Sequence, residues 1–225
     1  MTTRLSTSQP GLFDDPADDR KANADAHAEA RALPPGLLLH HTLIDPATER
    51  ALLQMVAGLP LHAARYKSYT ARRRVLAWGA RYDFDAGALQ MGSLEQLPPA
   101  LRTLRDQLAA FAGVAAADFA HAMVTEYTPG APLGWHRDAP GYEVIAGVSL
   151  AGHACMRWRP WQAPHVDPNA PPTAQLRPRP HDIVELDLAP RSAYVMRGPA
   201  RWAWQHSVAP VPALRYSVTM RTLRG

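Results

Sequence analysis

The second half of the chain alternates short apolar runs with breaks that contain proline or glycine, a pattern typical of strands joined by turns. From Phe119 onward no helical periodicity separates these runs. We therefore predict an antiparallel sandwich or jelly roll, that is, a double-stranded β-helix core. The predicted strands span residues 120–127, 144–150, 155–161, 183–188, 193–197, 204–208 and 215–222.

The first half contains two helical patterns and a short predicted strand at residues 37–41. Asp45 followed by Pro46 is a typical helix start, and the apolar stripe of this helix consists of Leu52, Leu53 and Val56. A second helix is predicted from apolar residues at spacings of three and four, ended by a glycine: Leu97, Leu101, Leu104, Leu108, Phe111 and Gly113. We expect both helices to cover a sheet, which gives a mainly β fold with flanking helices (α+β).

Two segments differ in composition from the rest of the chain. Residues 1–33 are rich in alanine, aspartate and small polar residues, and we expect a disordered tail ahead of a single domain at 34–225. Within this tail, Gln9, Leu12 and Phe13 resemble the Q-x-x-L-F peptides with which bacterial DNA-processing proteins dock on the sliding clamp. The segment 162–180 contains six prolines and no strand pattern, which predicts a long surface loop.

Composition narrows the class of protein. The 22 prolines, roughly twice average usage, favour short strands and many turns over long helices. The single cysteine, Cys155, excludes an internal disulfide framework and a cysteine-only zinc site. No apolar run approaches the roughly 20 residues that span a bilayer, and no export signal opens the chain. We expect a soluble, cytoplasmic monomer.

The formal charge of +4 is unevenly distributed. Residues 1–33 hold six acids and four bases, so residues 34–225 carry +6. Segment 65–81 has six basic side chains and no acid, interleaved with Tyr66, Tyr69 and Trp78. This mixture suits phosphate contact and base stacking, and it predicts a nucleic-acid partner held by Arg72, Arg73 and Arg74. A hairpin with a solvated basic face is the alternative.

The spacing His136-x-Asp138 predicts part of a metal site. In extended backbone, side chains two residues apart lie on one face, where an imidazole nitrogen and a carboxylate oxygen can bind the same ion. A third ligand should come from a distant strand, and His206 is the best candidate because it lies in an apolar, strand-like run. His153, His165 and His181 lie near glycine or proline and are expected to be surface histidines. Two histidines and one carboxylate are typical of non-haem Fe(II) oxygenases.

The last predicted strand carries two arginines on one face. Alternation places Arg215 and Arg221 on the same side as Ser217 and Thr219. Arginines on a buried strand require an anionic partner. They lie about 20 Å apart along the strand at roughly 3.3 Å per residue, so their side chains must converge on an elongated ligand. A dicarboxylate with one end near the metal fits this arrangement.

In sum, the chain resembles the AlkB-like Fe(II)/2-oxoglutarate-dependent dioxygenases, most strongly over residues 123–221. The residues that match the family pattern are Tyr127, Pro129, Gly130, His136, Asp138, His206, Arg215, Thr219 and Arg221. The resemblance implies that His136, Asp138 and His206 hold iron, and that Arg215 pairs with the distal carboxylate of 2-oxoglutarate. It also implies that Tyr127 and Arg221 help to hold the cosubstrate. Ser217 stands where the family commonly has asparagine.

By the same resemblance, the protein would remove N-alkyl groups from DNA or RNA bases as a repair-type demethylase. A base in a duplex would first be flipped and stacked between aromatic faces. Trp78 and Tyr82, opposite His136, are the candidates, with core packing as the alternative. Several repair members carry a further acid after H-x-D, where this chain has Ala139-Pro140-Gly141, and Glu143 is the possible substitute. The other functions considered are the same oxidation of a protein or small molecule, and a non-catalytic sensor.

Overall fold

The structure is a computed structural model that describes residues 33–66, 69–83, 86–161 and 182–225. The expectations for the N-terminal tail, including its clamp-docking residues, and for the loop at 162–180 lie outside the described residues. None of the described helices combines the length and the apolar character needed to cross a bilayer.

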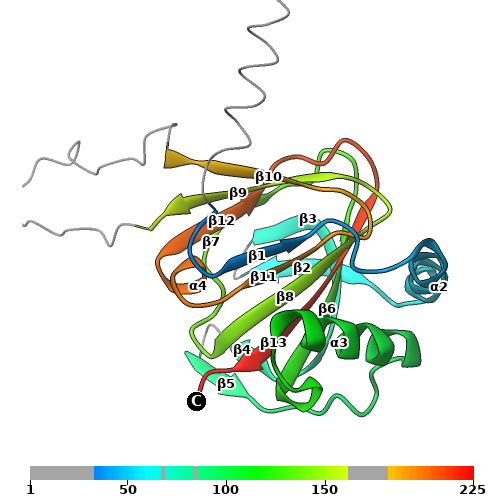
Figure 1. Cartoon of the computed structure of the whole chain (residues 1–225). Helices are drawn as coiled ribbons and strands as arrows, with labels where there is room; N and C mark the ends of the chain where they lie inside the picture. Colours follow the sequence, from blue (N-terminus) through cyan, green and yellow to red (C-terminus); the bar gives the residue numbers. More distant parts are fainter. Residues whose placement is uncertain (1–32, 67–68, 84–85, 162–181) are drawn as a thin grey trace, which may run out of the picture. The chain divides into compact units, whose positions relative to one another are not determined.

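A seven-stranded antiparallel sheet, here called the major sheet, forms the largest layer (Figure 1). β13 (Arg215–Leu223) lies near its middle, between β8 and β6, so its side chains face inward or toward the helices and few reach solvent. In spatial order the strands are β1 (Leu37–His40), β11 (Ala193–Met196), β8 (Tyr142–Leu150), β13, β6 (Phe119–Tyr127), β3 (Tyr69–Gly79) and β2 (His62–Tyr66).

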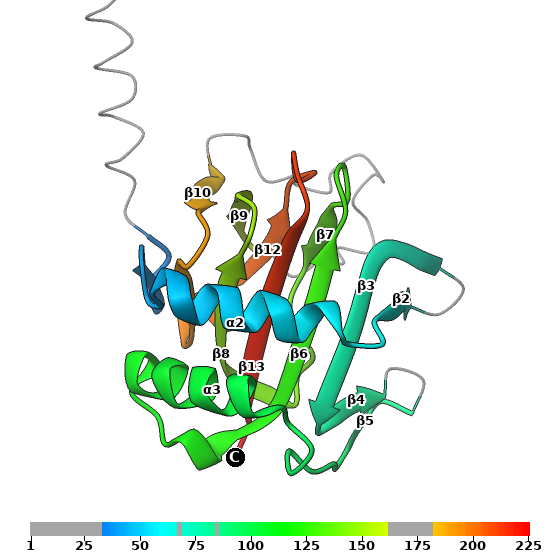
Figure 2. The ribbon, with the colours of Figure 1, turned by 90° about the vertical axis from the view of Figure 1, so that its right-hand side faces the viewer.

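Two helices cover the outer face of the major sheet, α2 (Pro46–Ala57) and α3 (Pro99–Ala112) (Figure 2). α2 begins where the Asp45 side chain accepts a hydrogen bond from the backbone N–H of Thr48 at 2.7 Å. α3 ends at Gly113, whose φ of 65° few other residues adopt without strain. The helix leucines pack against the outward side chains of β6, β8 and β13, which include Val124, Val148 and Val218.

A four-stranded antiparallel sheet, here called the minor sheet, faces the other side of the major sheet (Figure 1). Its spatial order is β10 (Val184–Leu188), β9 (Ala154–Pro160), β12 (Trp204–Val208) and β7 (Leu133–His136). A second apolar cluster, which includes Met156, Trp158 and Tyr194, joins the two sheets. This confirms the predicted jelly roll, and the space between the sheets is where the inward polar side chains meet.

The predicted strands and helices are found within one or two residues of their expected ends. The sequence analysis missed the short elements: β4 (Arg81–Asp83), β5 (Ala88–Gln90), β7 and α4 (Pro199–Trp202). Each is at most four residues long, too short to show a hydrophobic period. Most of the basic segment forms the hairpin of β2 and β3, which is compatible with either reading of its role.

Candidate active site

Three side chains from β7 and β12 meet between the two sheets. His136 is the last residue of β7 and pairs in register with His206 of β12, while Asp138 follows two residues later. Their potential ligand atoms all lie within 4.8 Å of one another, close enough to bind one ion. The pairing of β7 with β12 therefore brings together residues that are 68 to 70 positions apart, as the sequence analysis expected.

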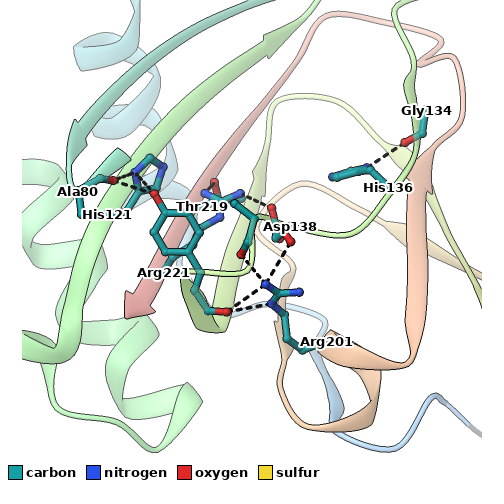
Figure 3. Close-up of polar contacts among 10 residues, drawn as sticks. Ala80, His121, Gly134, His136, Asp138, Arg201, Thr219 and Arg221 are labelled. Carbon is teal, nitrogen blue, oxygen red and sulfur yellow. Dashed lines mark hydrogen bonds and ion pairs between the residues drawn. The ribbon is translucent and has the colours of Figure 1, made fainter. Parts of the chain in front are cut away.

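The histidines are held in the form that binds metal. Nδ1 of His136 lies 2.9 Å from the carbonyl oxygen of Gly134, which can only accept, so Nδ1 donates and Nε2 is left for an ion (Figure 3). Burial and the neighbouring His136 lower the pKa of His206 to about 3. Burial also lowers the pKa of His136. Both rings are therefore neutral, as metal ligands must be.

Asp138 carries the negative charge of the site. Burial raises its pKa, but its interactions with Arg221, the two histidine rings and Arg201 outweigh this effect, so the net pKa lies below the usual range. Oδ1 accepts a hydrogen bond from Nη2 of Arg221 at 3.1 Å. Oδ2 is buried and has no hydrogen-bond partner among the described residues. A buried carboxylate oxygen without a partner is costly, and a cation bound there would compensate it.

Arg215 offers a complementary site for an anion. Its side chain is 1% exposed, and its Nε donates to Oγ of Ser149 at 2.9 Å. Nη1 is buried without a hydrogen-bond partner among the described residues, and the guanidinium carbon lies 5.0 Å from the ring centre of Tyr127. A guanidinium in this state fits a carboxylate, which would accept from the unpaired nitrogen.

The metal and anion sites share one pocket between the two sheets. Thr219 lies between them and accepts from Nη1 of Arg221 at 3.0 Å. The pocket brings together all eight residues that the sequence assigned to metal and cosubstrate: Tyr127, His136, Asp138, His206, Arg215, Ser217, Thr219 and Arg221. Its orphaned carboxylate oxygen and guanidinium nitrogen fit a cation and a carboxylate ligand respectively.

The expected substrate residues are not brought together in the same way. Trp78 packs against the apolar cluster beneath the helices, on the far side of the major sheet from the pocket. Arg74 points the same way and forms an ion pair with Glu126 at 2.7 Å. The expectation that these two face a substrate is therefore wrong, because β3 alternates its side chains and both fall on the outer parity. Arg72 is exposed.

Three other expected substrate residues lie closer to the site. Arg73 has the inner parity of β3, with its guanidinium carbon 5.9 Å from the ring centre of Tyr127 and its Nε buried without a hydrogen-bond partner among the described residues. Tyr82 on β4 lies beside Gly141, in the loop that follows Asp138. Glu143 accepts a hydrogen bond from Nε1 of Trp202 at 3.0 Å, so its carboxylate is already engaged.

Arg201, which the sequence analysis missed, fixes the loop after Asp138. Its buried guanidinium donates to the carbonyl oxygens of Asp138, Ala139 and Tyr142 at 2.6 to 3.2 Å (Figure 3). The Tyr142 hydroxyl donates to the carbonyl of Ala80, which ties the far end of the loop to the start of β4. Nothing in the sequence links Arg201 to a loop 60 residues earlier, since α4 is a single turn after Gly198-Pro199.

We expect Arg201→Met to weaken metal binding by roughly ten- to a hundredfold, the range found when groups behind metal ligands are removed. The loss arises because the backbone carbonyls of Asp138, Ala139 and Tyr142 lose their shared donor, so the loop that positions Asp138 is held less firmly. The measurement is metal affinity by titration, with unfolding followed in parallel. Arg102→Met, on the solvent side of α3, is the matched control. A metal affinity equal to that of the control would contradict this role.

Comparisons with known proteins agree with the pocket. The sequence model of the 2OG-Fe(II) oxygenase superfamily matches residues 55–222. A protein of Arabidopsis thaliana described as an "Alkylated DNA repair protein ALKBH8 homolog" is 28% identical over 188 residues. That alignment covers 77% of this chain and 51% of the relative, so the chain spans about half of its length.

Solved structures share the fold at low identity. The structure of OsALKBH1 superposes with a TM-score of 0.58 at 13% identity, covering 85% of this chain and all of that one. A Pseudomonas putida prolyl-4-hydroxylase gives 0.53 at 14% identity, covering 89% of this chain and 99% of the other. Because the family model spans most of the chain and the pocket has the required donors, the protein belongs to the 2OG-Fe(II) oxygenase superfamily as an AlkB-like enzyme that uses Fe(II), 2-oxoglutarate and O2.

Proposed function

We propose that this enzyme oxidatively removes alkyl groups from N-alkylated bases in DNA or RNA. The observation that carries the proposal is the 28% identity to an alkylated DNA repair homologue over 77% of the chain. Substrate class comes from this likeness, since structural neighbours below 25% identity share only the fold. The inward Arg73 adds a cation suited to a phosphate.

In this proposal, His136, Asp138 and His206 hold the iron, which with 2-oxoglutarate and O2 supplies the oxidation of the alkyl carbon. Arg215 binds the distal carboxylate of the cosubstrate through its unpaired Nη1. Arg221 keeps Oδ1 of Asp138 occupied and so directs Oδ2 to the metal. Tyr127, Ser217 and Thr219 line the wall between these two ends and complete the cosubstrate site.

On the substrate side, the proposal uses Arg73 and Tyr82. The guanidinium carbon of Arg73 lies 5.9 Å from the ring centre of Tyr127, which lines the pocket. Arg73 would bind a phosphate beside the flipped nucleotide. Tyr82 lies next to the loop after Asp138 and is the aromatic residue left to stack on the base. Trp78 and Arg74 have no part in this site.

The same oxidation of a protein side chain or a small molecule is the second candidate. It is favoured by the loop after Asp138, where Ala139-Pro140-Gly141 supply no carboxylate to read a damaged base. Glu143, the possible substitute, is bound by Trp202. Such a substrate would need no polyanion contact, so its turnover would be insensitive to salt.

The test is turnover of oligonucleotides that contain 1-methyladenine or 3-methylcytosine, in the presence of iron, 2-oxoglutarate and ascorbate. We expect loss of the methyl group by mass spectrometry together with formaldehyde, and no loss with His136→Ala, since that variant lacks one metal ligand. Slow consumption of 2-oxoglutarate while every methylated oligonucleotide stays intact would favour the second candidate and contradict the first.

A further inference from the structure

The outer face of the minor sheet carries arginines stacked on tryptophans. Arg159 and Arg157 have their guanidinium carbons 4.4 Å and 5.3 Å from the ring centre of Trp135. Arg137 stacks on Trp161 at 3.6 Å. The parity of the strands puts these side chains outside, because Met156, Trp158 and His206 point inward to the core and the pocket. We call Trp135, Arg137, Arg157, Arg159 and Trp161 the arginine–tryptophan strip.

The guanidinium groups of Arg157 and Arg159 are oriented but only partly used. Nε of Arg157 donates to Oγ of Ser207 at 3.2 Å, and Nε of Arg159 donates to Oε1 of Gln205 at 2.9 Å. Neither arginine forms an ion pair within the part of the chain that the structure describes. Stacking and one neutral hydrogen bond fix each plane, which leaves the two Nη groups to receive an anion in a forked geometry.

Arg159 is partly buried and forms no ion pair with an acid among the described residues, which is a second feature of an anion-binding site. Partial burial lowers the pKa of Arg159, and no nearby acid offsets the effect. The acids of this sheet lie on β10, the neighbour of β9, where Asp187 contacts His153 at 3.0 Å. Glu185 is the in-register partner of Arg157, but no ion pair joins their side chains. The side of the strip away from β10, with Arg159 and Arg137, is therefore its more positive part.

The strip is next to the pocket in the chain and at an edge of the sheet. Trp135 precedes His136 on β7, and Gln205 and Ser207 flank His206 on β12. The outward side chains of these two strands therefore lie at the strip, and their inward side chains lie at the metal site. β7 is the last strand of the minor sheet. A flexible chain lying on the strip can turn around this edge, over a sheet thickness of about 10 Å, to place one unit in the pocket.

From this geometry we propose that the arginine–tryptophan strip binds the phosphates of single-stranded nucleic acid that flanks the target base. The inference rests on the proposed function. A polyanion with a flexible backbone matches two preorganised guanidinium groups that lie beside aromatic rings and form no ion pair among the described residues. A duplex does not match as well, because it could not bend around the edge of β7 without a large deformation.

The experiment compares Arg157→Gln/Arg159→Gln in the full chain with Arg102→Gln/Arg105→Gln, an equal loss of charge on α3. Binding of a labelled single-stranded oligonucleotide is titrated over a series of salt concentrations. Each phosphate contact contributes about 0.7 to the slope of log K against log salt. We expect the slope to fall by about 1.4 and the affinity by about 25-fold at 0.1 M salt, whereas the control keeps both values. Turnover of 2-oxoglutarate without nucleic acid should be unchanged.

Arg157→Lys/Arg159→Lys separates charge from folding defects, since it should keep most of the salt slope and lose part of the affinity. An unchanged slope in the glutamine variant, with wild-type protein that binds the oligonucleotide, would overturn the inference and leave the proposed function standing. A wild-type protein that binds no oligonucleotide and demethylates none would overturn both. A normal loss of methyl groups with binding insensitive to the strip would overturn the inference alone.

Discussion

Asp138→Asn should reduce 2-oxoglutarate turnover by about a thousandfold or more, with loss of tightly bound iron. The substitution keeps the size of the side chain but removes the only negative ligand beside two neutral histidines. A bound metal contributes several kcal/mol to the oxidation, and each 1.36 kcal/mol is a factor of ten in rate. Metal content by elemental analysis and succinate formation measure the two losses.

The control for this variant must account for Arg221, whose guanidinium would lose its buried counter-ion. Removing one partner of a buried pair costs roughly 3–5 kcal/mol of stability, so the variant should be assayed only below its own unfolding transition. Asp106→Asn, on α3, is the matched exposed carboxylate. An Asp138→Asn protein that keeps one iron per chain and wild-type turnover would show that the metal lies elsewhere.

Arg215→Met should raise the KM for 2-oxoglutarate by about 30- to 4,000-fold and should not lower the stability of the protein without cosubstrate. A buried charge pair that loses one partner costs about 2–5 kcal/mol of binding, which corresponds to this loss of affinity. In the protein without cosubstrate, the guanidinium has a buried, unpaired Nη1, so an apolar side chain of similar length removes a desolvation cost. Binding and stability are expected to change in opposite directions.

Steady-state kinetics and thermal unfolding check this pair of effects, with Arg215→Lys as the conservative variant. Lysine keeps the charge and loses the fork, so its KM should lie between those of the wild type and the methionine variant. Lower stability of the metal-free methionine variant, with an unchanged KM, would mean that Arg215 holds Ser149 and the sheet together and does not bind the cosubstrate.

The two arginines of the candidate anion site could be placed on one face from the sequence because alternation is strict in a long strand. Arg215 and Arg221 lie on β13, which pairs on both sides through its whole length, so period-two parity holds. The spacing of His136 and Asp138 indicates a metal site only together with His206, and the pairing of β7 with β12 brings the three residues together. The register of β12 and β7 was not readable from sequence, since β7 has only four residues.

Which side chains line the substrate side of the pocket could not be read from the sequence. In the basic segment, Arg73 and Trp78 lie on opposite faces of β3. The sequence does not show which of these faces points toward the pocket, whereas the pairing of Arg74 with Glu126 does. Arg201 and Trp202 shape the loop after Asp138 from α4, a single turn. Contacts of this kind join residues some 60 positions apart and leave no local pattern to read.

These contacts also change how the missing acid should be understood. The backbone of the loop after Asp138 is held by Arg201, and Glu143 is held by Trp202. Oε1 of Glu143 is shared with Trp202, so any contact of this carboxylate with a base would be made from a position that Trp202 fixes.

The most direct test of the account is anomalous diffraction from crystals grown without oxygen with iron and 2-oxoglutarate. We predict one iron peak bound by Nε2 of His136, Nε2 of His206 and Oδ2 of Asp138, with Oδ1 still on Arg221. The distal carboxylate of 2-oxoglutarate should contact Nη1 of Arg215. An iron peak away from these three atoms, or a cosubstrate whose distal carboxylate binds Arg73 instead of Arg215, would contradict it.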